Sequence, residues 1–534
     1  MALALFAAVL AATAAAAADA TAVDAAAAAA APLPNIVLVL TDDAGFGSWP
    51  NSEIRTPALD ALAAESLRVT DAYTYRFCSP TRGALLTGRY PWRLPNTRMN
   101  LIPSSIMDGT PLSYNMLPAR LAAKGYISYH VGKYHQGFYA PQYTPLGRGF
   151  NHSNGFLSGG EDHFSQVADL SLNCSGFTAV RDAWLGDAPA PQLLGNYTAT
   201  RFTDAAVEHV REHRARYGAD TPFFLYLALH NTHAPLQSLP EFADMYANVS
   251  FRPQREYYAM MSTVDASVAN VTAALKAQSG MWDNTIFVWM TDNGAPVQVG
   301  GSNYPLRGGK GGNFEGGVKV PALFGGGLLP AARRGATTPS SDYFNVVDLY
   351  ATFLGLAGLP AADPGPLAPV DSEDLWPWLS GAAPASPRAN RTMVIDHTRY
   401  DEAALGQRGA LRRGAYKLLV GQTGGENQAS WYGRFSPNAS APAPSMDYFA
   451  CDGSVAPGGC LFAVGAGDAT EHVDLAAALP AVFEELLAEF HALNATYHAP
   501  NDNPPSDEAG EGAAAAAAGW IATPWRSEPL PGAL

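Results

Sequence analysis

Asn35-Ile36-Val37-Leu38-Val39-Leu40-Thr41-Asp42-Asp43 is the stretch from which the fold is first inferred. Residues 35–40 form a continuous run of β-branched residues and leucine after one asparagine. Such a run is typical of a strand that is buried on both faces of a parallel sheet. Because the run passes directly into Thr41-Asp42-Asp43, the sequence predicts polar side chains at the carboxyl end of this strand.

Three later segments repeat this arrangement of an apolar run followed by polar residues. They are Tyr126–Val131 before Gly132-Lys133-Tyr134-His135, Phe223–Leu229 before His230-Asn231-Thr232-His233, and Thr285–Met290 before Thr291-Asp292-Asn293-Gly294. Helical patterns lie between them over 58–67, 117–124, 201–216 and 255–277, the first behind Thr56 as a candidate N-cap. Strands that alternate with helices predict a doubly wound α/β domain, in which ligands bind beyond the carboxyl ends of the strands.

Polar residues also end strands as ordinary turn formers, and that alternative explains a single Asp-Asn-Gly well. It explains four such strand ends poorly. Asp42, Asp43, Asp292 and Asn293 offer hard oxygen ligands of the kind that calcium and magnesium prefer. Three carboxylates close together repel one another unless a cation holds them, so we expect a metal site here.

Cationic residues follow the same strands and form a candidate anion-binding wall. It comprises Arg82, Lys133, His135, His233, Lys310 and Arg307. Lys310 stands in Gly308-Gly309-Lys310-Gly311-Gly312, a segment that taken alone is more typical of a flexible surface loop. We expect His230 and His397 to be packed or surface histidines, and His209 and His213 to lie on a solvated helix face.

Composition excludes some classes of function. The 534 residues carry a net charge of -15, and no basic run is long enough to indicate nucleic acid or an anionic membrane surface as a partner. Residues 1–18 are apolar and end in small residues, as in a secretory signal peptide, the alternative being an uncleaved anchor. No later segment is long and apolar enough for stable membrane insertion.

Glycosylation signals support passage through the secretory pathway, to an extracellular or lysosome-like compartment. The Asn-x-Ser/Thr sequons are at Asn151, Asn173, Asn196, Asn248, Asn270, Asn390, Asn438 and Asn494. Only four cysteines occur, of which Cys451 and Cys460 are close enough in sequence to close a small loop, with Cys174 left over.

We expect five parts along the chain. They are a signal peptide over 1–18, an alanine-rich spacer over 19–33, a catalytic domain over 34–385, a small α+β domain over 386–500 and a largely mobile tail over 501–534. The small domain is inferred from a hairpin pattern over 410–420 and a helical pattern over 480–491. Together these patterns predict an antiparallel sheet with a helix packed on it.

Cys78-Ser79-Pro80-Thr81-Arg82 matches Cys-x-Pro-x-Arg, the signal for oxidation of a cysteine to formylglycine. With the strand-end motifs above, with Leu86-Thr87-Gly88-Arg89-Tyr90 and with Pro305-Leu306-Arg307-Gly308, the chain resembles the sulfatase family, and the arylsulfatase B type in particular. The resemblance runs from about Pro34 to Trp525. It departs from the usual pattern at Phe46 and Tyr134, where tryptophan is common, and in the loop over 311–314.

This resemblance implies an alkaline-phosphatase-like fold and a sulfuric ester hydrolase acting on sulfated sugars or aryl sulfates, such as an N-acetylgalactosamine-4-sulfatase. It implies that Asp42, Asp43, Asp292, Asn293 and modified Cys78 hold one calcium ion. Formylglycine 78, made by a formylglycine-generating enzyme, would be hydrated, and one hydroxyl would attack sulfur. Arg82 and His135 would orient that diol, while Lys133, His233 and Lys310 would bind sulfate, with His233 or Lys310 aiding departure of the alcohol.

Two alternatives remain open at this stage. One is a phosphate-ester or phosphonate hydrolase of the same superfamily, although such enzymes use Ser or Thr as nucleophile and more metal-binding histidine. The other is an inactive, secreted glycan-binding relative, although every expected catalytic residue is present.

Overall fold

The computed structural model describes residues 32–94, 109–168, 180–364, 367, 369–399, 407–421, 451 and 458–496. The predicted signal peptide, most of the spacer, the tail, Cys174 and the sequons at Asn173 and Asn438 lie outside these residues, as does the side chain of Asn494. The proposed domain boundaries stay predictions.

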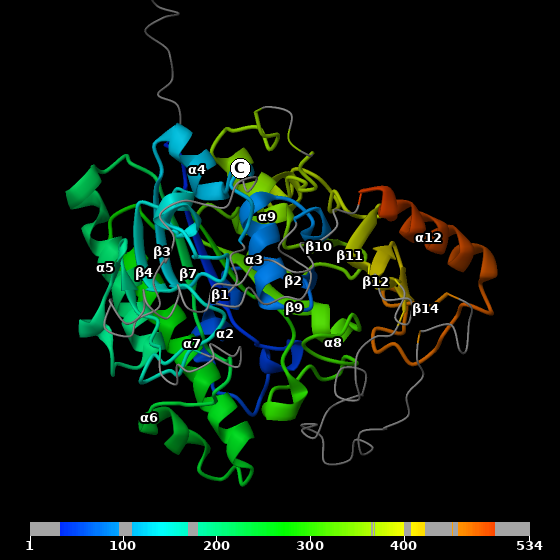
Figure 1. Cartoon of the computed structure of the whole chain (residues 1–534), viewed down its shortest axis with the longest axis horizontal. Helices are drawn as coiled ribbons and strands as arrows, with labels where there is room; N and C mark the ends of the chain where they lie inside the picture. The colour runs from blue at the N-terminus through cyan, green and yellow to red at the C-terminus, as the bar shows by residue number, and fades with distance from the viewer. Residues whose placement is uncertain are drawn as a thin grey trace, which may run out of the picture. The chain divides into compact units, whose positions relative to one another are not determined.

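A ten-stranded sheet forms the centre of the main body (Figure 1). Its order is β10-β2-β9-β8-β1-β7-β3-β4-β5-β6. The strands are β1 (Asn35–Thr41), β2 (Leu67–Tyr73), β3 (Ile127–Lys133), β4 (His152–Phe156), β5 (Trp184–Leu185), β6 (Ala188–Pro189), β7 (Phe223–Ala228), β8 (Thr285–Thr291), β9 (Lys319–Gly325) and β10 (Tyr343–Asn345).

The four strands predicted from apolar runs are neighbours in the middle of this sheet. β8, β1, β7 and β3 pair in parallel, with Val37 opposite Leu225 on one side and Phe287 on the other. β9 runs antiparallel to both β8 and β2, and β5 and β6 form an antiparallel edge. Because the four central strands are parallel, their carboxyl ends meet at one edge, as the predicted fold class requires.

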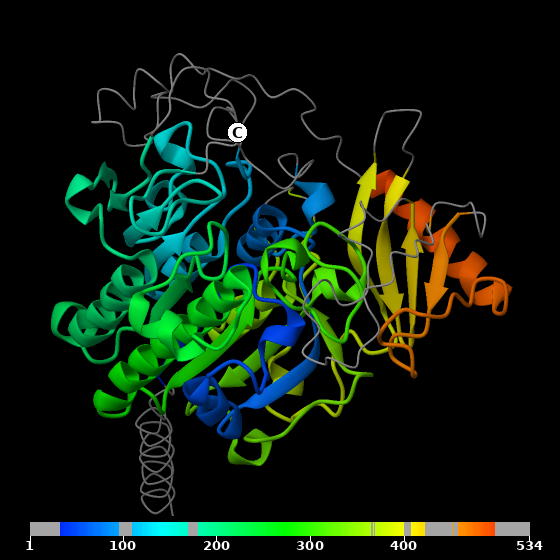
Figure 2. The same cartoon turned by 90° about the horizontal axis from the view of Figure 1, so that it is seen from below.

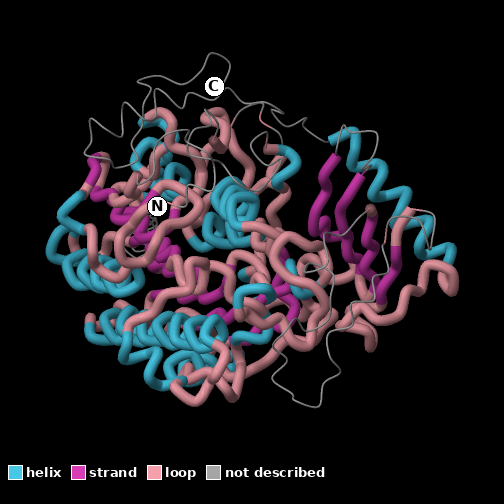
Figure 3. The backbone as a smooth tube through the Cα atoms, turned by 60° about the horizontal axis from the view of Figure 1, so that its bottom comes forward, coloured by secondary structure: helices cyan, strands magenta, loops and turns pink. Residues whose placement is uncertain are grey.

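Helices cover both faces of the sheet (Figure 3). On one face Val37, Val39, Leu225 and Leu227 share a core with α2, α5 and α7; on the other, Phe224 packs on Phe353 of α9. The helices are α2 (Pro57–Ala64), α3 (Cys78–Thr87), α4 (Leu117–Leu121), α5 (Thr198–Tyr217), α6 (Pro240–Ala243), α7 (Arg252–Ala277), α8 (Glu315–Val318), α9 (Asp348–Leu356) and α10 (Trp376–Leu379).

A second sheet of four antiparallel strands lies beyond the first in sequence (Figure 2). Its order is β11 (Thr392–Arg399), β12 (Gln407–Arg413), β13 (Tyr416–Val420) and β14 (Cys460–Phe462). Leu411, Leu418 and Leu461 pack on α12 (Pro480–Ala492), through Phe483, Leu486 and Phe490. A disulfide joins Cys451 to Cys460.

A buried ion cluster, which we name the joining cluster, connects the two sheets. It comprises Asp71, Glu315, Glu471, Lys319, Arg412 and Lys417. Lys417 Nζ of β13 lies 2.8 Å from Glu315 Oε1 of α8 and 2.9 Å from Glu471 Oε1. Arg412 Nη1 of β12 donates to Asp71 Oδ1 of β2 at 2.7 Å. The second sheet is thereby fixed to the segment that follows Lys310 in the chain.

Three sequence expectations differ from the structure. Thr56 makes no side-chain cap on α2; Asp265 of α7 instead accepts the Ala58 and Leu59 N–H groups, because a tertiary carboxylate reaches the helix end. The helix also ends at Ala64, and Leu67 opens β2. The prediction of a solvated face for His213 and His209 is wrong.

Tyr129 explains that error, because it brings both histidines onto the sheet. Its ring stacks on His209, and its hydroxyl lies 2.8 Å from His213 Nδ1.

The described helices include none that could span a bilayer.

Candidate active site

The carboxyl ends of β1 and β8 place three carboxylates side by side. Asp42 and Asp43 follow β1, and Asp292 follows β8. Asp43 adopts a left-handed backbone, with φ 62°, and its N–H donates to Asp292 Oδ1 at 3.2 Å. This turn directs both aspartates of one strand end toward the neighbouring strand end, and all three side chains are buried.

Cys78 begins α3 and meets these carboxylates from the helix side. Its Sγ lies 3.3 Å from Asp42 Oδ1, and the residue is only 2% exposed. Burial, together with Asp292 and Asp42, raises the pKa of the Cys78 thiol. A thiol that resists deprotonation is a poor nucleophile, so the unmodified cysteine is ill suited to direct attack.

The carboxylates do not share one ionisation behaviour. Burial alone would raise the pKa of Asp42, but Lys133, His233 and Arg82 outweigh it and hold that pKa well below its ordinary value. Burial and the neighbouring Asp42 raise the pKa of Asp292 to about 6. Opposite pKa shifts in neighbouring buried acids are common at functional sites.

The same group of side chains has the composition of a cation site. Ligand atoms of Asp42, Asp43, Cys78 and Asp292 all lie within 4.8 Å of one another. Asn293 donates through Nδ2 to Asp43 Oδ1 at 2.6 Å, while its own Oδ1 is buried without a hydrogen-bond partner in the described part of the chain. An orphaned amide oxygen beside three carboxylates suits a hard divalent cation.

Three cations pair with the three carboxylates. Lys133 Nζ lies 2.6 Å from Asp42 Oδ2, Lys310 Nζ lies 2.7 Å from Asp43 Oδ1, and Arg82 Nη2 lies 2.7 Å from Asp292 Oδ2. Arg82 also donates to the Lys133 carbonyl at 3.0 Å and lies 3.4 Å from Tyr226 Oη. Its guanidinium thus fixes strand ends β3 and β8 to α3.

Lys310 reaches the site because two backbone segments touch. A Cβ at Gly294 would lie 1.8 Å from the Gly316 carbonyl oxygen, so only glycine fits this approach. The Gly294 N–H donates to Gly317 O at 3.0 Å, and the Lys310 N–H to Ala295 O at 3.2 Å. These bonds hold the glycine-rich loop against the strand end that carries Asp292.

Two predicted histidines line the cluster in neutral form. Burial, with Lys133 and Arg82, lowers the pKa of His135 well below its ordinary value, and its Nδ1 has no partner among the described residues. Burial and Lys310 lower the pKa of His233, whose Nδ1 lies 2.7 Å from Ala234 O and whose Nε2 lies 3.9 Å from Asp43 Oδ2. Nδ1 therefore carries the proton, and Nε2 faces the carboxylates.

Every residue predicted for the nucleophile, the metal and sulfate binding thus lies at this edge, whereas Arg307 does not join the wall. Arg307 donates to Glu471 O at 3.3 Å and lies over the Phe314 ring. Two further residues were missed. Thr81 Oγ1 donates to Asp292 O at 2.7 Å, and Tyr226 accepts from Arg82. Thr81 lies inside the Cys-x-Pro-x-Arg motif, but Tyr226 has no sequence signal beyond its place in a buried strand.

His230 is packed, as expected, yet it lies next to the site. It is fully buried, and its ring stacks on His233 at 5.1 Å and on His163 at 4.3 Å. Asp42, His230 and His233 also offer ligand atoms within 4.8 Å of one another. His397 is packed against Phe490, far along the chain in the second sheet.

Comparison with known proteins agrees with this arrangement. The family model described as Sulfatase matches residues 34–359. Arylsulfatase J of Mus musculus is 29% identical over 89% of this chain and 78% of its own length, and Arylsulfatase A of Homo sapiens is 33% identical over 72% and 74%. N-acetylgalactosamine-6-sulfatase of Mus musculus is 33% identical over 65% of this chain and 66% of its own length.

Solved structures extend the similarity to nearly the whole chain. The crystal structure of Ps i-CgsB in complex with k-i-k-neocarrahexaose superposes with a TM-score of 0.71 at 26% identity, covering 91% of this chain and 97% of that one. The PsFucS1 sulfatase from Pseudoalteromonas sp. gives a TM-score of 0.64 at 21% identity, covering 89% and 91%, which supports the fold.

Proposed function

We propose, from the premise that the chain belongs to the sulfatase family, that Cys78 becomes formylglycine and acts with one calcium ion to hydrolyse sulfate esters of glycans. Sulfatases are sulfuric ester hydrolases of sulfated sugars or aryl sulfates, and they generally use formylglycine and a divalent metal. The observation that carries the proposal is the position of Cys78 Sγ, 3.3 Å from Asp42 Oδ1 inside the buried carboxylate cluster.

The donor set supports calcium as the metal. Asp42, Asp43, Asp292 and the orphaned Asn293 Oδ1 are all oxygen donors. Calcium favours six to eight such oxygens, whereas zinc favours nitrogen and sulfur. When bound, the ion would supply positive charge that offsets the carboxylates and polarises sulfate oxygens.

The chain's own residues divide the remaining work. Formylglycine, when present, supplies a hydrated aldehyde whose hydroxyl is the nucleophile toward sulfur. Arg82 holds Asp292 in place through two nitrogens, at 3.1 and 2.7 Å, and the Asp292 carboxylate can accept a proton from a neighbouring hydroxyl.

Lys133, Lys310 and His233 are proposed to bind the sulfate oxygens. Asp43 and other acids raise the pKa of Lys310 against the effect of burial, so its ammonium persists. His233 is neutral near pH 7 because its pKa is lowered. Lys310 therefore remains a cation beside the departing alcohol, while His233 contributes Nε2 to the site.

The proposed substrate is a sulfated glycan. The match to an N-acetylgalactosamine-6-sulfatase and to a structure that holds a neocarrahexaose supports a sugar substrate. An N-acetylgalactosamine-4-sulfatase-like specificity, expected from the arylsulfatase B resemblance, stays a prediction, as does that subtype.

Maturation in the secretory pathway completes the proposal. Cys78 is 2% exposed, so a formylglycine-generating enzyme must reach it before folding is complete. Sequons at Asn151, Asn196, Asn248, Asn270 and Asn390 lie on exposed residues, which supports glycosylation there and delivery to an extracellular or lysosome-like compartment.

Peptide mass spectrometry of the Cys78 peptide tests the modification directly. We expect loss of the sulfur and an aldehyde in its place; a free thiol in all of the material would contradict the proposal. Cys78→Ala should lower release of sulfate from a chromogenic aryl sulfate by at least about 10³-fold, as for loss of a nucleophile. Cys78→Ser is the matched control, because it retains a hydroxyl but not the aldehyde and should also fail to turn over. Full activity of either variant would contradict the proposal that formylglycine 78 is the nucleophile.

A further inference from the structure

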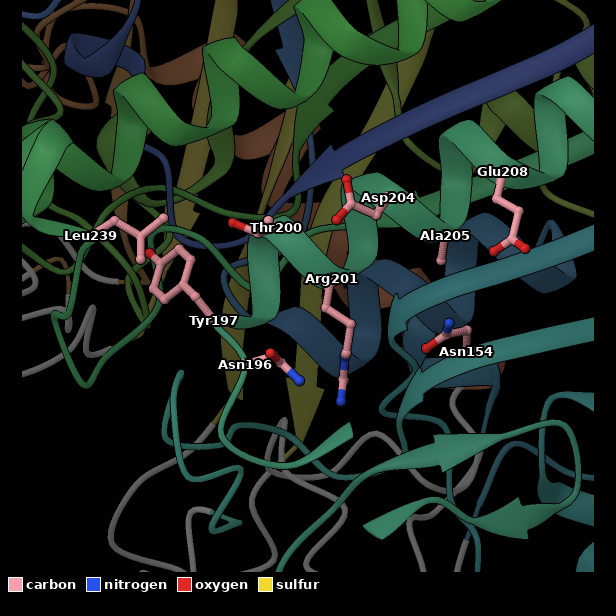
Figure 4. A pocket seen from close by; sticks show the side chains of 9 residues that line it. All are labelled: Asn154, Asn196, Tyr197, Thr200, Arg201, Asp204, Ala205, Glu208 and Leu239. Atoms are coloured by element: carbon pink, nitrogen blue, oxygen red, sulfur yellow. The ribbon is translucent and has the colours of Figure 1, made fainter. Parts of the chain in front are cut away.

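A pocket of about 430 Å³ lies beside the N-terminal half of α5. Arg201 projects from this helix toward Asn154 of β4 and Asn196, which precedes the helix (Figure 4). Tyr197 and Leu239 close one end with apolar surface. None of these residues belongs to the cluster around Cys78.

Arg201 is buried without a hydrogen-bond partner. It is 8% exposed, and none of Nε, Nη1 and Nη2 has a partner among the described residues. The Phe202 ring, 4.7 Å from the guanidinium carbon, leaves the N–H groups at the edge of the guanidinium unused. Asn154 Oδ1 also has no partner among the described residues; since an amide oxygen only accepts, Nδ2 is the atom of this side chain that can donate to an anion. A planar cation with several unsatisfied donors facing a pocket has the geometry that binds an oxyanion through two parallel N–H groups.

Nearby acids do not supply that partner. Glu161 is fully buried, yet neither of its carboxyl oxygens has a hydrogen-bond partner in the part of the chain that is described. Burial raises the pKa of Glu161 well above its ordinary value against the opposing charge of Arg201, and no hydrogen bond joins the two side chains. The Asp182 carboxylate already accepts the N–H groups of Leu157 and Ser158.

Two further acids line the pocket, but at its solvent rim. Asp204 and Glu208 are exposed. Because water and salt screen exposed charges, these two acids weaken the attraction of an anion to Arg201, but they do not take the place of the anion as its partner.

We propose that this pocket binds an oxyanion, the carboxylate or sulfate group of an acidic glycan, on the guanidinium of Arg201 with the side-chain amide of Asn154. The glycan as source of that group rests on the proposed function; inorganic sulfate has the same chemistry and is the other source.

The pocket shares a wall with the sulfate-binding residues. The Tyr197 ring packs on His163 at 5.7 Å, and His163 Nε2 lies 3.0 Å from the His233 carbonyl oxygen. His230 stacks between His163 and His233. One layer of imidazoles thus separates the two anion sites, so an extended substrate with a second acidic group could engage both.

Steady-state kinetics on two substrates test the inference. Arg201→Gln should raise KM for a sulfated oligosaccharide with more than one acidic group about tenfold, the value of one lost charge-assisted pair. It should leave kcat, and both constants for a small chromogenic aryl sulfate, unchanged. Arg211→Gln, an exposed arginine on the same helix, is the matched control and should alter neither. Arg201→Lys retains the positive charge but not the two parallel N–H groups, so its KM for the oligosaccharide should lie between those of the wild type and Arg201→Gln. This variant also tests the proposal if Arg201→Gln folds poorly.

Neutralising the rim acids decides whether the occupant is anionic. Asp204→Asn and Glu208→Gln should lower KM for the oligosaccharide if the pocket holds an oxyanion. A rise in KM would mean that these acids accept hydrogen bonds from neutral sugar hydroxyls, and would overturn the proposal.

Crystals soaked in selenate distinguish the two sources. If selenate binds Arg201 and Arg201→Gln does not change KM for the oligosaccharide, the natural occupant is a free inorganic anion. If selenate binds and Arg201→Gln also raises that KM, the occupant is the acidic group of the substrate. Neither effect, in a wild-type protein that releases sulfate, overturns the inference. Failure of the wild type to release sulfate from either substrate would instead contradict the proposed function, while the selenate soak would still test the pocket.

Discussion

Two buried clusters in this molecule contain the same numbers of acidic and basic side chains but differ in how far the polar atoms around them are hydrogen-bonded. The catalytic-edge cluster contains Asp42, Asp43 and Asp292 with Arg82, Lys133 and Lys310. The joining cluster contains Asp71, Glu315 and Glu471 with Lys319, Arg412 and Lys417. In both, each carboxylate lies within 2.9 Å of a lysine or arginine.

The difference lies in the polar atoms around the ion pairs. In the joining cluster Tyr73 donates to Glu315 Oε2, and the Glu315 N–H donates to Glu471 Oε2. Glu471 Oε1 accepts no hydrogen bond among the described residues but lies 2.9 Å from Lys417 Nζ, so each oxygen of these two carboxylates faces a cation or a donor, and we call this cluster closed. Around the catalytic-edge cluster, Asn293 Oδ1, His135 Nδ1 and both His230 ring nitrogens have neither an ion pair nor a hydrogen-bond partner among the described residues, and we call this cluster open. Charge balance therefore does not identify a site; unsatisfied buried atoms at converging strand ends do.

The largest expected effect comes from breaking the open cluster. Asp292→Asn should lower sulfate release on the order of 10³-fold, because it removes a proton acceptor and a ligand together. The amide nearly matches the carboxylate in shape, so the circular dichroism spectrum should be unchanged. Asp244→Asn, at an exposed position, is the control. Near-normal turnover by Asp292→Asn would show that the open cluster is not catalytic.

Breaking the closed cluster, which is the joining cluster, should lower the free energy of unfolding. Lys417→Met leaves Glu315 and Glu471 as buried carboxylates without their shared cation, which should cost about 3–5 kcal/mol of unfolding free energy in urea. Lys276→Met, which removes an exposed pair with Glu65, should cost less than about 1 kcal/mol. Equal losses in the two variants would mean that the joining cluster contributes no more than a surface ion pair.

Chelation of divalent ions should again affect only the open cluster. A ligand that binds the folded state alone stabilises it by about 2.7 kcal/mol at a hundred times its Kd. Chelator should therefore lower the melting temperature of the wild type, and added calcium should restore it. The melting temperature of Asp292→Asn should hardly respond. An unchanged wild-type melting temperature would argue against a resident cation.

The central sheet and its catalytic edge were predictable because their signals are local. Each of β1, β3, β7 and β8 is an apolar run that passes into its functional residues, and parallel pairing brings these ends together. Cys78 was identified from a five-residue motif, and the structure places its thiol among the predicted ligands.

What was not predictable depends on partners far away in the chain. Arg412 meets Asp71 across 341 residues, and Asp265 replaces Thr56 as the cap of α2 across about 207 residues. Arg307 looked like an anion-binding residue by its neighbours in sequence, but it donates to the carbonyl oxygen of Glu471, in the segment between β14 and α12. No local pattern encodes such pairings, because they arise when separate elements pack.

The smallest expected effect is a pH dependence that belongs to the closed cluster. Burial raises the pKa of Glu471 to about 7 even though Lys417 opposes it, whereas the ordinary value is 4.5. The folded protein therefore binds this proton more tightly than the unfolded chain, and the stability present below pH 4.5 is lost as pH rises toward 7. Between about pH 5 and pH 7 this amounts to about 2 kcal/mol.

Glu471→Gln isolates that contribution from other titrating groups. Glu315, whose pKa is lowered by Lys417 and Lys319 against burial, contributes stability that is lost only as pH falls below 4.5, outside this window. Asp265 and Asp371, with pKa values near 6, titrate inside it but are unchanged by the substitution. Urea titrations at several pH values should therefore show a flatter profile for Glu471→Gln than for the wild type or for the exposed Glu484→Gln. If the three profiles were parallel, Glu471 would already be ionised in the folded protein at pH 5. The closed cluster would then carry its full charge throughout this pH range.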